Sequence, residues 1–184
     1  PFDGVTPYQH VPFQFSIHCL ENENAELRHI EYLARPNIDH RKELLVKLLD
    51  SIPENACVIA WSSSFEIMVL KYLAGWFPEY KERIDGLISN VRDIAGPFKQ
   101  RDIYSWKMNG SFSLKTVLPA FVPELSYDGL DISHGGMAMA AYFDMCESQD
   151  FIEIERIRKA LLEYCKLDTL AMVRILEKVK EMSA

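Results

Sequence analysis

The sequence of 184 residues lacks any apolar run approaching the ~20 residues that a membrane-spanning helix needs. It also has no basic, apolar leader with a small-residue cleavage site, so nothing in it argues for export. Its cysteines are far apart and form no Cys-x-x-Cys pair, which argues against a zinc cluster. We therefore expect a cytoplasmic protein with four reduced core cysteines, Cys19, Cys57, Cys146 and Cys165.

Several chemical signatures are also missing. The chain has no nucleophile elbow and no glycine-rich phosphate loop, which argues against an α/β hydrolase. Without repeats, low-complexity tracts or a linker, residues 1–184 should form a single domain. The net charge of −7 argues mildly against nucleic-acid binding, but an acidic nuclease can gather its basic residues in one groove. Because the chain begins at Pro1 in a loop-like stretch without methionine, we expect it to be part of a longer polypeptide.

The hydrophobic pattern predicts an α/β layer with helices on both faces. Residues 11–19 alternate as a half-buried strand, residues 21–24 form a turn, and residues 25–34 pair back as a hairpin. A buried strand over 56–61 leads directly into a helix over 64–76, with Ser64 as its N-cap. The other expected helices cover 39–50 (capped by Asp39), 79–88, 114–123 (capped by Ser113), a small-residue stretch from Gly135, and 151–182, with 91–113 irregular.

The last helix has an acid within its apolar face. At helical spacing one stripe contains Ile157, Leu161, Tyr164, Asp168, Ala171 and Ile175. Burying an unpaired carboxylate is costly, so Asp168 needs a hydrogen-bond partner, a proton or a metal. Tyr164, four residues earlier, can reach the same point, either as ordinary core beside a structural aspartate or as part of a site.

These residues resemble a known group of nucleases. The Tyr-x-x-x-Asp spacing resembles the last motif of the tyrosine-containing branch of DnaQ-like 3′→5′ exonucleases, and "SSSFE" resembles their second motif. "VRDIAG" (91–96) is similar to the aspartate-bearing segment that often follows. "PYQHVPFQFSIH", "GSFSLKTVLPAFVPELSYD", "GGMA" and "YCKLDTLAMV" also resemble a bacterial family of uncharacterised ribonuclease-H-like domains. This resemblance implies a ribonuclease-H-like α/β fold, a mixed sheet flanked by helices.

The resemblance further implies a metal-dependent 3′→5′ exonuclease domain. Asp168 and Glu66 would be ligands of Mg²⁺ or Mn²⁺ in a two-metal site, and the Tyr164 hydroxyl would orient the attacking water. Glu66 has a structural alternative, because an acid in the first turn of a helix is favoured by the helix dipole. Ser62 stands where many relatives have asparagine, and Asp93 reads as a buried capping or turn acid.

The first motif of that superfamily, Asp-x-Glu on the first strand, is absent. We expect that strand upstream of Pro1, which leaves at most half of the metal site and predicts negligible nuclease activity for this chain alone. The alternative is a non-catalytic module that keeps the fold for binding nucleic acid or protein.

Residues 92–115 are locally basic, with five basic residues against two acidic ones, and aromatic residues are interleaved with them. Aromatic side chains beside positive charge hold single-stranded DNA or RNA by stacking; the alternative is a solvated loop that packs its aromatics onto the core. His134 reads as a loop residue, and the other histidines show no ligand spacing. The expected nucleic-acid contacts are Phe65, Lys99, Arg101, Tyr104, Trp106 and Lys115.

Overall fold

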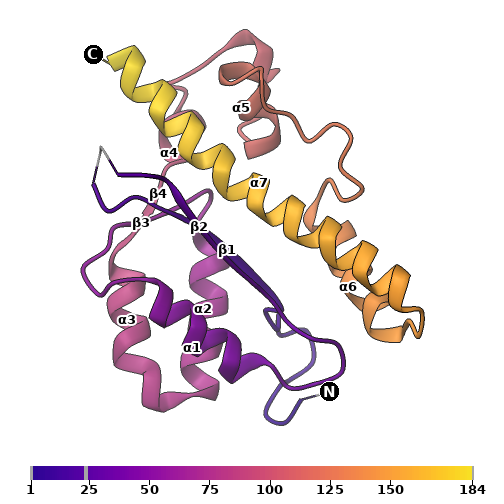
Figure 1. Ribbon diagram of the computed structural model, residues 1–184. Coiled ribbons are helices and arrows are strands. Elements are labelled where there is room, and N and C mark those ends of the chain that lie inside the picture. Colours follow the sequence, from indigo (N-terminus) through magenta and orange to yellow (C-terminus); the bar gives the residue numbers. More distant parts are fainter. Residues whose placement is uncertain (1, 23–24, 184) are drawn as a thin grey trace.

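Two short pairs of strands lie among the helices of the computed structural model, which describes residues 2–22 and 25–183 (Figure 1). β1 (Gln14–Cys19) and β2 (Arg28–Leu33) form an antiparallel hairpin, so the predicted hairpin is confirmed. Residues 23 and 24 of its expected turn lie outside the described residues. β3 (Val58–Ala60) and β4 (Val91–Asp93) pair in parallel. The α/β class is therefore confirmed, although the described strands form two separate sheets of two strands each rather than one mixed sheet.

Helices make up most of the rest of the molecule. Within residues 2–22 and 25–183, none of them has the length and apolarity needed to cross a membrane. The α-helices are α1 (Arg41–Ser51), α2 (Ser64–Trp76), α3 (Lys81–Ser89), α4 (Gly96–Gln100), α5 (Leu114–Phe121), α6 (Gly135–Glu147) and α7 (Phe151–Ser183), with short 3₁₀ turns η1 (Pro78–Tyr80) and η2 (Trp106–Met108).

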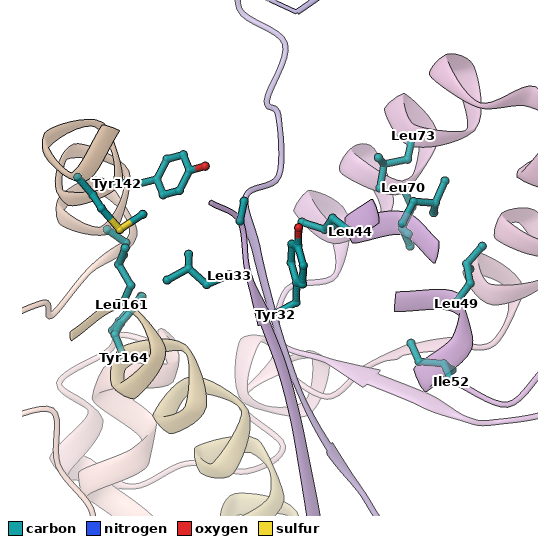
Figure 2. Close-up of a cluster of buried hydrophobic side chains, with 14 of the residues drawn as sticks. Tyr32, Leu33, Leu44, Leu49, Ile52, Leu70, Leu73, Tyr142, Leu161 and Tyr164 are labelled. Atoms are coloured by element: carbon teal, nitrogen blue, oxygen red, sulfur yellow. The ribbon is translucent and has the colours of Figure 1, made fainter. Parts of the chain in front are cut away.

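The hairpin separates two groups of helices. α1, α2 and α3 gather on one side of it, and α6 and α7 lie on the other (Figure 1). Successive residues of a strand point to opposite faces, so Tyr32 faces the side of Leu44 while Leu33 faces the side of Tyr142 and Leu161 (Figure 2). The hairpin is thus packed on both faces.

The polar face of β1 bonds to α7 rather than to solvent. The Gln14 side chain donates to the Leu161 carbonyl at 2.8 Å. The Ser16 hydroxyl lies 2.9 Å from the Thr169 hydroxyl, and His18 Nδ1 lies 2.8 Å from the same oxygen. These bonds fix α7 along the strand and so position the residues of its central turns.

A second hydrophobic cluster lies toward the C-terminal end of α7. It joins α7 to α5, α4 and η2, and its buried members are Phe98, Met108, Val117, Leu118, Val122, Ala171 and Ile175. The first cluster includes the earlier part of the same helix, up to Tyr164. Asp168 therefore lies on α7 between the two clusters.

Four sequence expectations about local structure were wrong. β4 lies inside the stretch expected to be irregular, because three residues are too few to show a strand pattern. The N-cap of α2 is Ser63, since Ser64 is already helical. The N-cap of α1 is His40, while Asp39 accepts a hydrogen bond from the Arg41 amide at 3.2 Å. All four cysteines are free, but Cys57, just before the short β3, is exposed rather than part of the core.

Candidate functional site

Asp168 lies on the buried stripe of α7, as the sequence predicted. Its stripe neighbours are buried, with exposed fractions of 9% for Tyr164 and 0% for Ala171, while Asp168 itself is half-buried. Long-range packing holds this part of the helix, through β1 on one side and α5 on the other. The carboxylate is therefore presented by a helix that is packed on both sides, at the boundary between the two hydrophobic clusters.

Two tyrosines act on the Asp168 carboxylate. Tyr127, in the segment between α5 and α6, donates its hydroxyl to Asp168 Oδ1 at 2.6 Å. Tyr164, four residues earlier on the same helix, also acts on the carboxyl, in the direction that lowers its pKa. Hydrogen bonds to an ionised acceptor are short and strong, which offsets part of the cost of burying the charge. The partner that Asp168 requires is thus present in the protein itself.

Lys115 adds a positive charge to this group. Its Nζ lies 5.0 Å from the centre of the Tyr164 ring and 5.3 Å from that of Tyr127, so it makes cation–π contacts with both. It also donates a hydrogen bond to the Ser133 carbonyl. We call Lys115, Tyr127, Tyr164 and Asp168 the tyrosine–aspartate cluster.

The electrostatics of this cluster follow from burial. Desolvation raises the pKa of the Asp168 carboxyl, while the hydrogen bond from Tyr127, the effect of Tyr164 and the charge of Lys115 act in the opposite direction. Burial lowers the pKa of Lys115, and the Asp168 charge opposes that shift. Burial, followed by the charge of Asp168, raises the pKa of Tyr127, so its hydroxyl stays a donor at neutral pH.

Glu66 lies in a second acidic group, at the carboxyl ends of the parallel strands. It belongs to the first turn of α2, which begins shortly after β3. Although the residue is exposed, desolvation of its carboxyl raises its pKa, a backbone hydrogen bond opposes the shift, and the negative charge of Asp93 adds to it. The two acids therefore act on each other.

Asp93, at the end of β4, organises the adjoining turn. Its Oδ1 accepts hydrogen bonds from the amides of Ser62 and Ala95, both at 2.9 Å, and Lys99 Nζ lies 3.3 Å from its Oδ2. Desolvation alone would raise the pKa of Asp93, but these bonds outweigh it and the net pKa is lowered. Asp93 is thus the turn acid that the sequence predicted, but exposed rather than buried.

The described residues do not complete a metal site. Across residues 2–22 and 25–183, no three or more histidine, cysteine, aspartate or glutamate side chains are grouped so that they could hold a metal ion. Asp168 interacts with tyrosines and a lysine, whereas Glu66 interacts with Asp93. Carboxylate oxygens are suitable ligands for Mg²⁺ or Mn²⁺, so the ligand pair Asp168 and Glu66 stays a prediction, with two further carboxylates still to be supplied.

Most of the expected nucleic-acid contacts lie on the surface. Trp106 is 77% exposed, Phe65 54% and Tyr104 51%, and Lys99 and Arg101 are exposed as well. Lys115 was also expected there, but it is half-buried in the tyrosine–aspartate cluster, because α5 packs against α7. Phe98, the aromatic nearest Lys99 in sequence, is 3% exposed and belongs to the second hydrophobic cluster.

Three features were missed by sequence reasoning. Tyr127 meets Asp168 across 41 residues of chain, and no local pattern indicates this contact. His18 and His29 lie opposite each other across the hairpin with ring centres 4.6 Å apart, and the alternating pattern does not indicate this pair because it does not fix the register of the strands. His134, which was expected to be a loop residue, is the N-cap of α6. Its Nδ1 accepts a hydrogen bond from the Met137 amide at 3.2 Å.

Comparison with known proteins gives one match. No curated protein and no solved structure matches the chain. The model of one protein family matches residues 1–113, more than half of the sequence. The chain therefore belongs to the family described as "Domain of unknown function (DUF2779)".

Proposed function

We propose that the chain is a ribonuclease-H-like domain of the metal-dependent 3′→5′ exonuclease type, acting on DNA or RNA. The observation that carries the proposal is the pair Tyr164 and Asp168, four residues apart on the inner face of α7, with Tyr164 buried and Asp168 half-buried. That pair has the spacing and helical setting of the last motif of the nucleases that the sequence resembles.

A bound Mg²⁺ or Mn²⁺ would lower the pKa of a water molecule and stabilise the leaving oxygen. Asp168 on α7 and Glu66 in the first turn of α2 are the residues of this chain that would hold it, because carboxylate oxygens suit these ions. Tyr164 would keep the Asp168 carboxylate in one orientation. Such a centre uses four carboxylates, so the proposal requires two that the described residues do not supply.

The test is hydrolysis of a 5′-labelled single-stranded oligonucleotide, as DNA and as RNA, with Mn²⁺. Residues 1–184 would be compared with the chain together with whatever its gene encodes ahead of Pro1. We expect a descending ladder from the longer protein and none from residues 1–184. Asp168→Asn should abolish the ladder, whereas Asp144→Asn, at an exposed aspartate of α6, should leave it unchanged. A longer protein that produces no ladder on either substrate would contradict the proposal.

A second candidate function is binding of single strands without cleavage. It is favoured by the exposure of Trp106 and Tyr104 next to Arg101 and Lys107. Fluorescence anisotropy of a labelled oligonucleotide in EDTA measures this binding without cleavage. Trp106→Ala should weaken it about tenfold, since stacking of one base is worth about 1–3 kcal/mol. The control is Phe151→Ala, which removes an exposed aromatic side chain of α7 and should leave binding unchanged. Trp76→Ala is unsuitable as a control because Trp76 packs against the core.

A further inference from the structure

The outer edge of β2 is not paired with another strand within residues 2–22 and 25–183. All six residues of β2 pair with β1 in continuous register, and none of them is proline. A regular strand edge of this kind is a template for another strand, because its amides and carbonyls are spaced to bond one. β2 therefore offers a row of backbone donors and acceptors on its outer side.

The outward backbone groups of this edge belong to His29, Glu31 and Leu33. The Ala34 amide donates to the Phe13 carbonyl at 2.8 Å, and in an antiparallel pair every second residue bonds to the partner strand. The residues between direct their amides and carbonyls away from β1. In the part of the chain that the structure describes, no backbone group bonds to the outward groups of His29 and Glu31.

A groove lies between this edge and α7. We call it the α7 groove; its charged lining residues are Glu31, Glu155, Arg158, Lys159, Glu163 and Lys166. Two of its three cations are already engaged, because Arg158 donates to the outward Leu33 carbonyl at 3.4 Å and Lys159 lies 3.7 Å from Glu163. Of the cations, that leaves Lys166 to balance Glu31 and Glu155.

These two acids are weakly compensated. Glu155 is exposed and forms no ion pair with the residues that the structure describes. Glu31 lies 3.7 Å from the His29 ring, but burial lowers the pKa of His29, so this imidazole does not neutralise the carboxylate at pH 7. The α7 groove therefore favours a basic side chain.

A second groove lies on the opposite face of the hairpin, against α1. We call it the α1 groove; its lining residues include Phe15, Arg28, Ile30, Lys47 and Asp50. Phe15 and Ile30 give it an apolar floor, and Arg28 and Lys47 are each paired with an acid outside it. Glu31 lines both grooves, so the edge of β2 lies between them.

We propose that the outer edge of β2 binds an extended segment of a partner protein in which lysine or arginine alternates with apolar residues. Successive side chains of a strand point to opposite faces, so the basic residues enter the α7 groove beside Glu31 and Glu155. The apolar residues enter the α1 groove over Phe15 and Ile30. Main-chain hydrogen bonds to β2 provide affinity, and the two grooves determine which side chains fit. The site goes beyond the proposed function and shares no residue with the tyrosine–aspartate cluster.

A second copy of the chain fits this edge less well. Antiparallel pairing of two β2 edges about Glu31 places two carboxylates opposite each other, which is destabilising. The net charge of −7 also makes two copies repel, whereas it attracts a basic segment. Charge therefore favours a basic partner over self-association.

The test is fluorescence anisotropy with labelled peptides. The probe is a peptide in which lysine and valine alternate, and its control has the same composition in a shuffled order. The native chain should bind the alternating peptide about tenfold more tightly than the shuffled one, because only the alternating peptide fits both grooves. Equal binding of the two peptides overturns the proposal.

Methylation of peptide amides separates strand pairing from charge attraction. In an antiparallel arrangement the residue opposite Glu31 shares its face, so the lysine amides point toward β2. N-methylation of the lysines should abolish binding, and N-methylation of the valines should leave it nearly unchanged. The reverse result supports the proposal with a parallel strand. Equal effects of the two methylated peptides, including no effect, overturn it.

Two variants test the edge in the protein. Glu31→Pro removes an outward amide but none of the bonds to β1, and Glu31→Lys reverses the charge beside the α7 groove. Each should weaken binding of the alternating peptide about tenfold, whereas Glu147→Lys, at an exposed residue of α6, should not. Should Glu31→Pro fail to fold by circular dichroism, Glu31→Lys and the methylated peptides decide.

Equal peptide binding by Glu31→Lys and Glu147→Lys overturns the proposal. So does a native dimer, seen by sedimentation, that Glu31→Pro converts to monomers, because a second copy would then occupy the edge.

Discussion

At the scale of single residues, the Asp168 carboxylate shows how a fold tolerates a charge on an apolar helix face. The Tyr127 hydroxyl donates to it, and Tyr164 and the Lys115 ammonium also favour its charged form, so the charge is compensated within the protein. Removing one hydrogen-bond partner leaves a buried charge without full compensation. The resulting loss of stability is larger than the net contribution of the intact hydrogen bond. The cluster is therefore sensitive to small changes.

Tyr127→Phe should lower the free energy of unfolding by about 1.5–3 kcal/mol, the cost of losing a hydrogen bond to a charged group. The phenyl ring keeps the packing of the original side chain, so the loss reports on the hydroxyl. Urea denaturation followed by circular dichroism measures it. Tyr104→Phe removes a hydroxyl from a side chain that is 51% exposed and should change stability by less than about 0.5 kcal/mol. Equal effects of the two substitutions would contradict the hydrogen-bonding role.

His18 should make the chain lose stability in mild acid. Burial, then the charges of His29, Lys166 and Arg174, lower the pKa of His18 to about 4 from 6.5. Between these values the unfolded chain binds more protons than the folded one, so the free energy of unfolding falls as the pH falls through this window.

Urea denaturation from pH 7 to pH 4 measures this dependence. His18→Gln should flatten the slope between pH 6.5 and 4, and His10→Gln, at an exposed loop residue, should keep the native slope. A His18→Gln protein with the native slope would show that His18 does not carry the effect.

At the scale of elements, helices and strands with a long periodic pattern were predicted well, whereas short strands and contacts between distant residues were not. The stripe on α7 predicted both its extent and its buried face, because a 33-residue helix repeats its pattern many times. The alternation in β1 likewise predicted the hairpin. β4 has only three residues, too few to show the alternation of a strand in the sequence. It forms because β3 lies beside it and pairs with it.

In the candidate site, too, the residues close in sequence were predicted and the distant ones were not. Tyr164 and Asp168 share a helix, so their spacing alone placed them together. Tyr127 reaches Asp168 from a segment without regular structure, and Lys115 lies within a locally basic stretch that suggested a surface role. Both depend on how α5 and the segment after it pack against α7, which is a tertiary property that a local pattern does not contain.

Leu161→Ala tests the packing of α7 against the hairpin. Leu161 is 0% exposed within the first hydrophobic cluster, so its truncation should cost about 2–5 kcal/mol through lost burial and a cavity. Lys159→Ala, two residues earlier on the exposed face, should be nearly neutral, because an exposed ion pair contributes little. Chemical denaturation of both variants measures the difference, and a Leu161→Ala protein as stable as Lys159→Ala would contradict this account of the core.

At the scale of the whole molecule, charge is distributed unevenly. The net charge is −7, yet Lys99, Arg101 and Lys107 lie close together in sequence beside exposed aromatic residues. An acidic protein gains little long-range attraction to nucleic acid, so any binding should depend on this local group. The salt dependence of binding then reports how many of these cations meet phosphates.

If about three cations contact a single strand, the logarithm of the association constant should fall with the logarithm of salt concentration with a slope of about −2. Anisotropy titrations between 50 and 200 mM salt, in EDTA, would measure the slope. Arg101→Met should make it shallower, because one phosphate contact is lost, whereas Trp106→Ala should weaken binding without changing the slope, because stacking releases no counterions. Lys159→Met, on the exposed face of α7, removes the same charge as Arg101→Met away from the aromatic residues and should leave both affinity and slope unchanged. A slope that responds equally to Arg101→Met and Lys159→Met would show that binding senses only the overall charge, and this basic, aromatic segment would then not be the nucleic-acid interface.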